Sequence, residues 1–276
     1  MFFFNYTILM NQFQRQDKKQ VKQVKILFLA IYNETPHYIQ MYNTRLIYMN
    51  FLKNNIHKTN QTIPIFYFIL FKNLENKEYY LDDEKYILYI HGEETFLPGI
   101  LDKTIKALDI FQNKLKMEYD FVVRSNISTF MNFENVFSYL SNFNNPKTEM
   151  YYIGAMQKVK WLDPKGGIVD KQYWGTIFAS GVCIIMSSAL VNNIINNREK
   201  LHYNIIDDVS IGHYISHLEN VNMLNIRETL ISFRPHCLML DKTQLCYMNN
   251  FNKRWREIDC DNLRKIVNHF MKIEYR

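Results

Sequence analysis

The sequence predicts an α/β protein with a central, mixed but mostly parallel sheet flanked by helices. Short apolar runs bounded by polar residues, such as KILFLAIY at residues 25–32, alternate with longer segments whose apolar residues recur at helical spacing. A run that is apolar at every position is typical of a strand covered on both faces, as strands of parallel sheets are. Up to residue 125 the order is strand, helix, strand, strand, helix, strand, which is typical of a parallel-sheet layer.

Each element of the first half has a local signal. Pro36 stands at a position that a helix tolerates, so a helix is expected after the first strand. The next strands are expected at residues 63–71 and 86–91. A long helix then begins at Pro98 and Gly99, and its apolar positions have a period near 3.6. The apolar positions of these two helices are Tyr38, Tyr42, Leu46, Met49 and Leu52, then Leu101, Thr104, Leu108, Phe111 and Leu115.

The second half continues the pattern. Strands are expected at 120–125, 151–156, 182–186 and 221–226, and a helix from about Asn132. The aromatic-rich segment 161–174, with a turn at residues 164–167, is expected to be an extended excursion or hairpin. Residues 232–240 are expected to be irregular around Pro235. A closing amphipathic helix carries Leu263, Val267 and Phe270. No repeat or linker is visible, which predicts a lead-in at 1–24 and one domain at 25–276.

Composition limits the function classes. A hydrophobic content of 47% and an aromatic content of 15% are enough for a buried core, which argues against a disordered chain. The net charge of +6 and pI of about 8.9 suit a nucleotide-diphosphate substrate, an anionic membrane surface or nucleic acid. The apolar N-terminal ten residues are too short to span a bilayer and lack the charged region of a signal peptide. We therefore expect no transmembrane segment and a cytoplasmic location, with peripheral membrane contact left open.

The four cysteines show no zinc or redox spacing. Cys183 lies inside an apolar strand and is expected to be a buried free thiol. Whether Cys237 and Cys246 pair is left open, and so is the oligomeric state.

The most informative stretch is 173–212. A small-residue turn at residues 179–181, which ends in Gly181, precedes the strand at 182–186, and Ser187 and Ser188 can cap the helix that follows. Asp207 and Asp208 then stand where a loop enters another helix. Two carboxylates at such a junction, next to a strand entered through glycine, indicate a functional site.

This stretch resembles the beta-1,3-glycosyltransferases, the galactosyl-, N-acetylglucosaminyl- and Fringe-type enzymes. They carry a similar small-residue-Gly strand, a Ser-capped helix and an acidic pair followed by Val-x-x-Gly, here Asp207-Asp208-Val209-Ser210-Ile211-Gly212. The segment 101–108, LDKTIKAL, resembles the family's Leu-Thr-x-Lys-Thr helix. The resemblance covers roughly residues 25–240 and implies a GT-A-type, Rossmann-like fold. Its nucleotide-sugar half would be 25–132, and its acceptor half with the closing helix 133–276.

The chain departs from the family at the metal-binding D-x-D turn. The apolar frame of residues 123–132 is kept, but Asn126 and Ser128 stand where the carboxylates would be. Their oxygens carry no charge, so dependence on Mn²⁺ or Mg²⁺ is expected to be weak or absent. If a metal binds, the candidate ligands are Asn126, Ser128 and His236. A lone histidine, however, is more often an ordinary polar residue.

Basic side chains are candidates to replace the metal at the donor diphosphate. Arg124 and Lys103 suit this role because guanidinium and ammonium groups both stabilise phosphate. For Arg124, a structural ion pair at a strand end fits the sequence equally well. Tyr32 and Asn33 end the first strand, where α/β sheets bind ligands, although a solvent-facing loop is nearly as good an interpretation. The candidate donor-binding residues are Tyr32, Asn33, Lys103, Arg124, Ser125, Asn126 and Ser128.

On the acceptor side, Trp161, Tyr173 and Trp174 are candidates to line a sugar pocket, with core packing as the alternative for at least one of them. The resemblance implies acceptor contacts at Trp174 and Gly181, because a side chain at 181 would intrude on the sugars.

The resemblance implies a hexosyltransferase-like enzyme. It would move a sugar from a nucleotide-diphosphate donor to a hydroxyl of a glycan or glycoconjugate acceptor, with inversion. Asp208, in preference to Asp207, would be the base. Adjacent carboxylates cannot flank one glycosidic bond, which argues against a two-carboxylate hydrolase at this motif. Two alternatives stay open. One is a non-catalytic nucleotide-sugar- or glycan-binding relative. The other is a basic nucleic-acid-binding protein, which only the charge supports.

Overall fold

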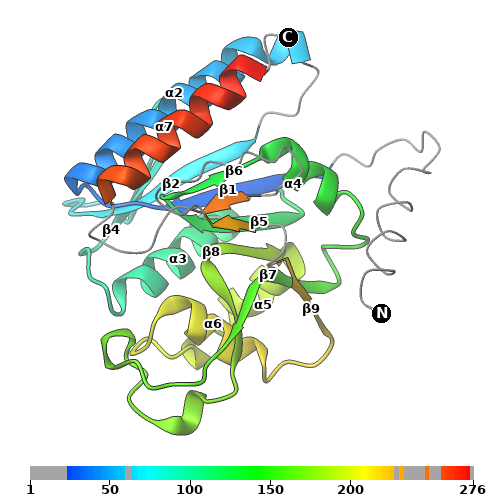
Figure 1. The fold of residues 1–276 in the computed structure, drawn as a ribbon. Helices are drawn as coiled ribbons and strands as arrows, with labels where there is room; N and C mark the ends of the chain where they lie inside the picture. Colours follow the sequence, from blue (N-terminus) through cyan, green and yellow to red (C-terminus); the bar gives the residue numbers. More distant parts are fainter. Residues whose placement is uncertain (1–23, 60–63, 227–229, 233–245, 249–255, 274–276) are drawn as a thin grey trace.

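The structure is a computed structural model that describes residues 24–59, 64–226, 230–232, 246–248 and 256–273. The predictions for His236, for Cys237 and for nearly all of the lead-in lie outside the described residues. Elements are labelled as in Figure 1.

An eight-stranded sheet divides the molecule, with helices against both of its faces (Figure 1). The strand order is β3-β4-β2-β1-β5-β8-β7-β9, and all strands except β3 and β8 run in one direction. The predicted mixed, mostly parallel α/β sheet is therefore confirmed, and the arrangement agrees with the expected GT-A-type fold. The strands are β1 (Ile26–Ile31), β2 (Ile65–Lys72), β3 (Tyr79–Asp82), β4 (Ile87–His91), β5 (Phe121–Asn126), β7 (Met150–Lys158), β8 (Ile177–Ser187) and β9 (Val221–Asn225).

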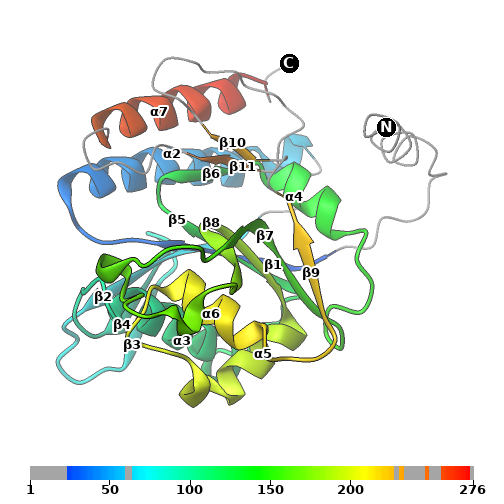
Figure 2. The ribbon, with the colours of Figure 1, turned by 60° about the horizontal axis from the view of Figure 1, so that its bottom comes forward.

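Two helical layers cover the sheet because its strands are apolar on both faces. In β1 the side chain of Phe28 packs on one side, and those of Leu27 and Leu29 pack on the other. Figures 1 and 2 show α2 and α7 side by side over the first face and α3, α5 and α6 against the second. The helices are α2 (Pro36–Thr59), α3 (Gly99–Asp109), continued by the π-helical turn η1 (Ile110–Lys114), α4 (Phe133–Leu140), α5 (Ser188–Asn196), α6 (Asp207–Ile215) and α7 (Arg256–Ile273).

Local capping explains several helix starts. Pro36 is the first residue of α2, as predicted. The side chain of Ser187 caps α5 by accepting a hydrogen bond from the backbone N–H of Leu190 at 3.4 Å. Asn132 caps α4 in the same way, through the N–H of Asn135 at 3.3 Å. These contacts confirm the predicted starts of α2 and α5.

Some short strands were not predicted. β3 pairs antiparallel with β4 at the edge of the main sheet. A second sheet joins β6 (Thr129–Met131) to β11 (Cys246–Met248), which pairs with β10 (Leu230–Ser232). A three-residue strand leaves almost no periodic signal, and the partners of β6 lie far along the chain. Residues 129–131, for which no strand was predicted, therefore form β6.

The segment that joins β7 to β8, taken together with the last residue of β7 and the first residue of β8 (residues 158–177), is called the excursion. It is the green to yellow-green loop at the lower left of Figure 1, and it contains the turns η2 (Pro164–Gly166) and η3 (Lys171–Tyr173). At Gly167, where φ is +75°, an added Cβ would lie 2.0 Å from the carbonyl oxygen of Asn204, so glycine is required. The predicted excursion or hairpin at residues 161–174 is confirmed, with an antiparallel bridge between Asp163 and Ile168 inside it. Its inner side packs with the start of α6 through a small apolar cluster of Val159, Ile168, Tyr173, Phe178, Ile205 and Val209.

Two further expectations concern single features. Cys183 is a buried free thiol, as predicted. None of the helices built from the described residues combines the length and the apolar character needed to cross a bilayer.

Candidate active site

Predicted site residues from three elements meet near the carboxyl ends of β1 and β5. Arg124 and Asn126 belong to β5, Gly181 belongs to the adjacent β8, and Asp207 and Asp208 begin α6. In the sheet, β1 lies between β2 and β5, so the chain continues first to one side of β1 and later to the other. Ligands of open α/β sheets bind outside the strand ends at such a reversal of strand order.

Arg124 forms a buried ion pair with Asp207. The Arg124 side chain is 1% exposed, and the Asp207 side chain is 10% exposed. The other terminal nitrogen, Nη1, donates to the carbonyl oxygen of Gly181 at 2.6 Å and to Oδ1 of Asn126 at 3.4 Å. The sequence allowed either a phosphate contact or a structural ion pair for Arg124, and the structure shows the ion pair.

Asp208 is held by backbone N–H groups. Its two carboxylate oxygens accept hydrogen bonds from Gly181 at 3.1 Å and from Val209 at 2.9 Å. Burial raises the pKa of Asp208 to about 7, and the adjacent charge of Asp207 adds to the rise. The Gly181 N–H and the charge of Arg124 oppose it. The residue as a whole has intermediate exposure to solvent.

Two glycines set the distance between these groups. At Gly181 an added Cβ would lie 2.6 Å from Nη1 of Arg124, so the space that a side chain would fill is occupied by the guanidinium. At Gly212 a Cβ would lie 2.5 Å from the Cβ of Phe178 and 2.7 Å from the carbonyl oxygen of Ile177. Gly212 therefore lets α6 approach the backbone of β8 and fixes where Asp207 and Asp208 lie. This is a physical reason for the glycine that follows the acidic pair.

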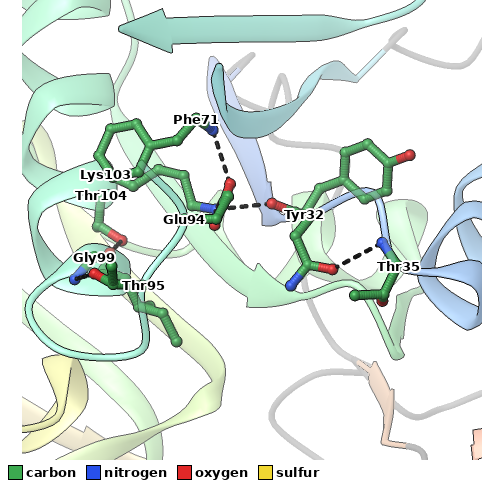
Figure 3. A network of polar contacts seen from close by, with 10 residues as sticks. Tyr32, Thr35, Phe71, Glu94, Thr95, Gly99, Lys103 and Thr104 are labelled. Carbon is green, nitrogen blue, oxygen red and sulfur yellow. Dashed lines mark hydrogen bonds and ion pairs between the residues drawn. The ribbon is translucent and has the colours of Figure 1, made fainter. Parts of the chain in front are cut away.

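Lys103 forms a second ion pair, with Glu94 (Figure 3), in which the lysine side chain is 1% exposed and the Glu94 side chain is 29% exposed. Its ammonium nitrogen contacts both oxygens of Glu94, at 2.6 and 2.7 Å, and donates to the carbonyl oxygen of Tyr32 at 2.8 Å. Glu94 also accepts from the backbone N–H of Phe71 at 2.8 Å. Burial lowers the pKa of Lys103, although Glu94 opposes this change. These contacts link the ends of β1 and β2 to α3, and the ammonium group of Lys103 donates its hydrogen bonds to acceptors within the protein.

The residues at the end of β1 differ in exposure. Tyr32 is buried, with its ring stacked on that of Tyr42 at 5.2 Å, and burial raises its pKa to about 12. Asn33 is half-buried, and its side-chain oxygen accepts a hydrogen bond from the backbone N–H of Thr35 at 3.2 Å. Of the two, Asn33 is the one whose side chain reaches solvent.

The turn after β5 offers only neutral oxygens. Ser125 and Ser128 are buried, and Asn126 is half-buried. Oδ1 of Asn126 faces the guanidinium of Arg124, whose positive charge disfavours a divalent cation at that oxygen. Within the described ranges, no three His, Cys, Asp or Glu residues are grouped so as to hold a metal ion. These residues do not fit a D-x-D-type Mn²⁺ or Mg²⁺ site, and the actual metal dependence stays a prediction.

The three aromatic candidates on the excursion differ in their exposure to solvent. Tyr173 is in the apolar cluster at 1% exposure, and its hydroxyl is 2.7 Å from Nδ1 of His202, so core packing describes it. Trp174 is 45% exposed with Lys171 over its ring at 4.9 Å, and Trp161 is 61% exposed. Acceptor contacts at Trp174 and Gly181 stay predictions.

Sequence reasoning missed Glu94, and it placed Gly212 in the acidic motif without giving it a structural role. Glu94 follows a predicted strand and precedes the Pro98-Gly99 helix start, so its place at a strand end was a usable signal. No signal in the sequence indicates that Glu94 is the partner of Lys103, because no local pattern links these two side chains.

No family model matches this chain, and no curated protein matches its sequence. Among solved structures, the chain is similar to a glycosyltransferase involved in the glycosylation of the major capsid of PBCV-1. The TM-score is 0.47 and the identity 8%, over 87% of this chain and 99% of that one. A similarity this weak does not carry residue roles from one chain to the other.

Proposed function

We propose that this protein is a glycosyltransferase that moves a sugar from a nucleotide-diphosphate donor to an acceptor hydroxyl, with inversion at the anomeric carbon. The observation that carries the proposal is Asp208, whose carboxylate has its pKa raised to about 7 and is oriented by two backbone N–H groups beside β8. A general base works best when its pKa lies near the operating pH. The resemblance of residues 173–212 to glycosyltransferases supports the reaction class.

In the proposed step, the acceptor hydroxyl gives its proton to Asp208 while its oxygen forms a bond to the anomeric carbon. The bond from that carbon to the diphosphate oxygen breaks, and the nucleoside diphosphate leaves with the electron pair. Asp208 then releases its proton to solvent. A positioned base of this kind contributes about 10²–10⁴-fold in rate.

Asp207 and Arg124 serve as positioning residues in this proposal. The guanidinium that pairs with Asp207 also donates to the carbonyl of Gly181, whose N–H holds Asp208. The ion pair thus fixes the strand position that orients the base. Because Lys103 and Arg124 are both paired with carboxylates, the partly exposed Asn33 and Asn126 are the better candidates for direct donor contact.

The proposal is tested by measuring nucleoside-diphosphate release from a panel of nucleotide sugars, alongside thermal shifts with each donor. Binding raises the melting temperature according to concentration and affinity. Donor binding without turnover, over a broad set of acceptor sugars, would instead support the non-catalytic relative. That alternative is favoured by one feature, the neutral Asn126 and Ser128 at the turn.

The pH dependence of transfer is the first expected outcome. Asp208 must be unprotonated to act as the base, so turnover should rise with pH through about 7 and level off above it. Asp207→Asn removes a negative charge that raises the pKa of Asp208, so the rising limb should move to lower pH. Initial rates across pH for both proteins measure this. If turnover rises over the same pH range in Asp207→Asn as in the parent, Asp208 is not the titrating group.

The second expected outcome concerns the dependence of turnover on divalent ions. EDTA should change turnover by less than about twofold, because the turn after β5 supplies no charged ligand. The matched variant Asn126→Asp with Ser128→Asp restores carboxylates and should gain a response to Mn²⁺. Rates with EDTA, and with Mn²⁺ added back, decide the question. Complete loss with EDTA and recovery with Mn²⁺ in the unmodified protein would contradict the metal-independent proposal.

A further inference from the structure

The outer side of the excursion carries a concentration of exposed apolar side chains. Nine large hydrophobic residues of the described chain are exposed, and five of them lie within residues 161–177. The other four, Ile39, Ile47, Tyr80 and Phe96, are spread over other elements. The five are Trp161 (61% exposed), Leu162 (45%), Val169 (64%), Trp174 (45%) and Ile177 (43%). A grouping of this kind marks an interaction surface rather than ordinary surface scatter.

Backbone pairing explains why these side chains face outward. Asp163 and Ile168 form an antiparallel bridge, and Ile168 points into the cluster over α6. Because successive side chains alternate across a strand, the flanking Leu162 and Val169 lie opposite each other on the outer side. Hydrogen bonds of 3.0 Å join Val159 to Gly175 and Thr176, which brings together the two arms that carry Trp161 and Trp174.

Charge accompanies the apolar groups. Four exposed lysines occur at residues 158–177, against two aspartates, which gives a net charge of +2. Both carboxylates are engaged inside the excursion, where Asp163 accepts from the N–H of Gly166 at 3.2 Å and Asp170 from that of Gln172 at 2.8 Å. The lysines are Lys158, Lys160, Lys165 and Lys171.

We propose that the outer surface of the excursion docks on a bilayer that contains anionic lipids. Tryptophan favours the boundary between headgroups and acyl chains, aliphatic side chains favour the acyl side, and lysines attract anionic headgroups. A glycan does not account for Leu162, Val169 and Ile177, since sugars stack on flat rings. A second copy would bring two sets of lysines together, which like-charge repulsion disfavours.

Docking in this way has a consequence for the candidate site. The inner side of the excursion is fastened to the start of α6, where the N–H of Ile206 donates to the carbonyl of Gly166 at 2.8 Å. Asp208 lies two residues further along the chain. The docked protein would therefore present its candidate base close to the membrane surface. The docking itself stands on the surface alone and does not depend on the proposed reaction.

The test is co-sedimentation of the full chain with vesicles of phosphatidylcholine, with and without phosphatidylglycerol. Binding should be about tenfold or more tighter to the anionic vesicles and should weaken with salt. Leu162→Ser with Val169→Ser should lower it by about tenfold or more. The matched control is Ile39→Ser with Ile47→Ser on α2, which removes two exposed apolar side chains elsewhere and should leave binding unchanged. Melting curves check the fold of both variants.

A second readout does not depend on those variants. Trp255→Phe leaves Trp161 and Trp174 as the only tryptophans of the chain. Their fluorescence should shift to the blue with anionic vesicles and be quenched by brominated lipid. The proposal is overturned by an absence of vesicle binding, by equal losses in the α2 control, or by tryptophans that report no contact with lipid. Self-association that the Leu162→Ser, Val169→Ser variant abolishes would assign the surface to a second copy instead.

Discussion

Replacing Asp208 with asparagine is expected to lower the rate of sugar transfer by about 10²–10⁴-fold, because the amide cannot accept the acceptor proton. The side-chain oxygen remains able to accept one of the two hydrogen bonds that Gly181 and Val209 now donate to the carboxylate. Donor binding should persist, since the change removes the base and not the strand ends. Turnover and donor thermal shifts of the same preparation measure the two effects separately.

Stability provides the control for this variant. Asp208 has a folded-state pKa of about 7 against its usual 3.8, so the folded chain holds the proton more tightly than the unfolded chain. The contribution to stability is therefore full below pH 3.8 and is lost as pH rises through about 7. Asp208→Asn removes this dependence and should be no less stable than the parent at pH 8. Near-normal turnover in the variant would show that Asp208 is not the base.

Local signals in the sequence were enough for most of the fold. The apolar runs that became β1, β2 and β5 are buried along most of their length, as expected for strands with helices on both faces. Ser187 and Pro36 mark helix starts through contacts made within a few residues. Each of these signals depends only on neighbours along the chain, which is why it is visible without a structure.

What the sequence missed depends on distant partners. β6 forms because residues 129–131 pair with residues 246–248, and neither segment carries a local signal that predicts this pairing. Arg124 and Asp207 are 83 residues apart. The sequence left Arg124 open between a phosphate contact and a structural ion pair, and it could not name Asp207 as the partner. Because they pair with each other, the proposed roles of both residues change from direct substrate contact to positioning. Charged side chains near a site are thus predicted as a set more safely than as individual roles.

The second large effect is expected for Arg124→Met, which keeps the length of the side chain and removes its charge. Asp207 would be left buried without its partner, and the carbonyl of Gly181 would lose its 2.6 Å donor. Breaking a buried ion pair from one side costs about 3–5 kcal/mol. The positive charge of Arg124 also lowers the pKa of Asp208, so the rising limb of the pH–rate profile should move to higher pH. Chemical denaturation and the pH profile are the two measurements.

The double variant Arg124→Met with Asp207→Asn separates a positioning role from a simple loss of folding. It removes both charges, so no buried charge is left unpaired and much of the lost stability should return. Transfer should stay depressed, because the Gly181 carbonyl still lacks the donor that fixes the strand beside Asp208. Recovery of both stability and turnover would reduce the ion pair to a fold element without influence on the base. A pH profile that moves to lower pH in Arg124→Met would contradict the electrostatic part of the proposal.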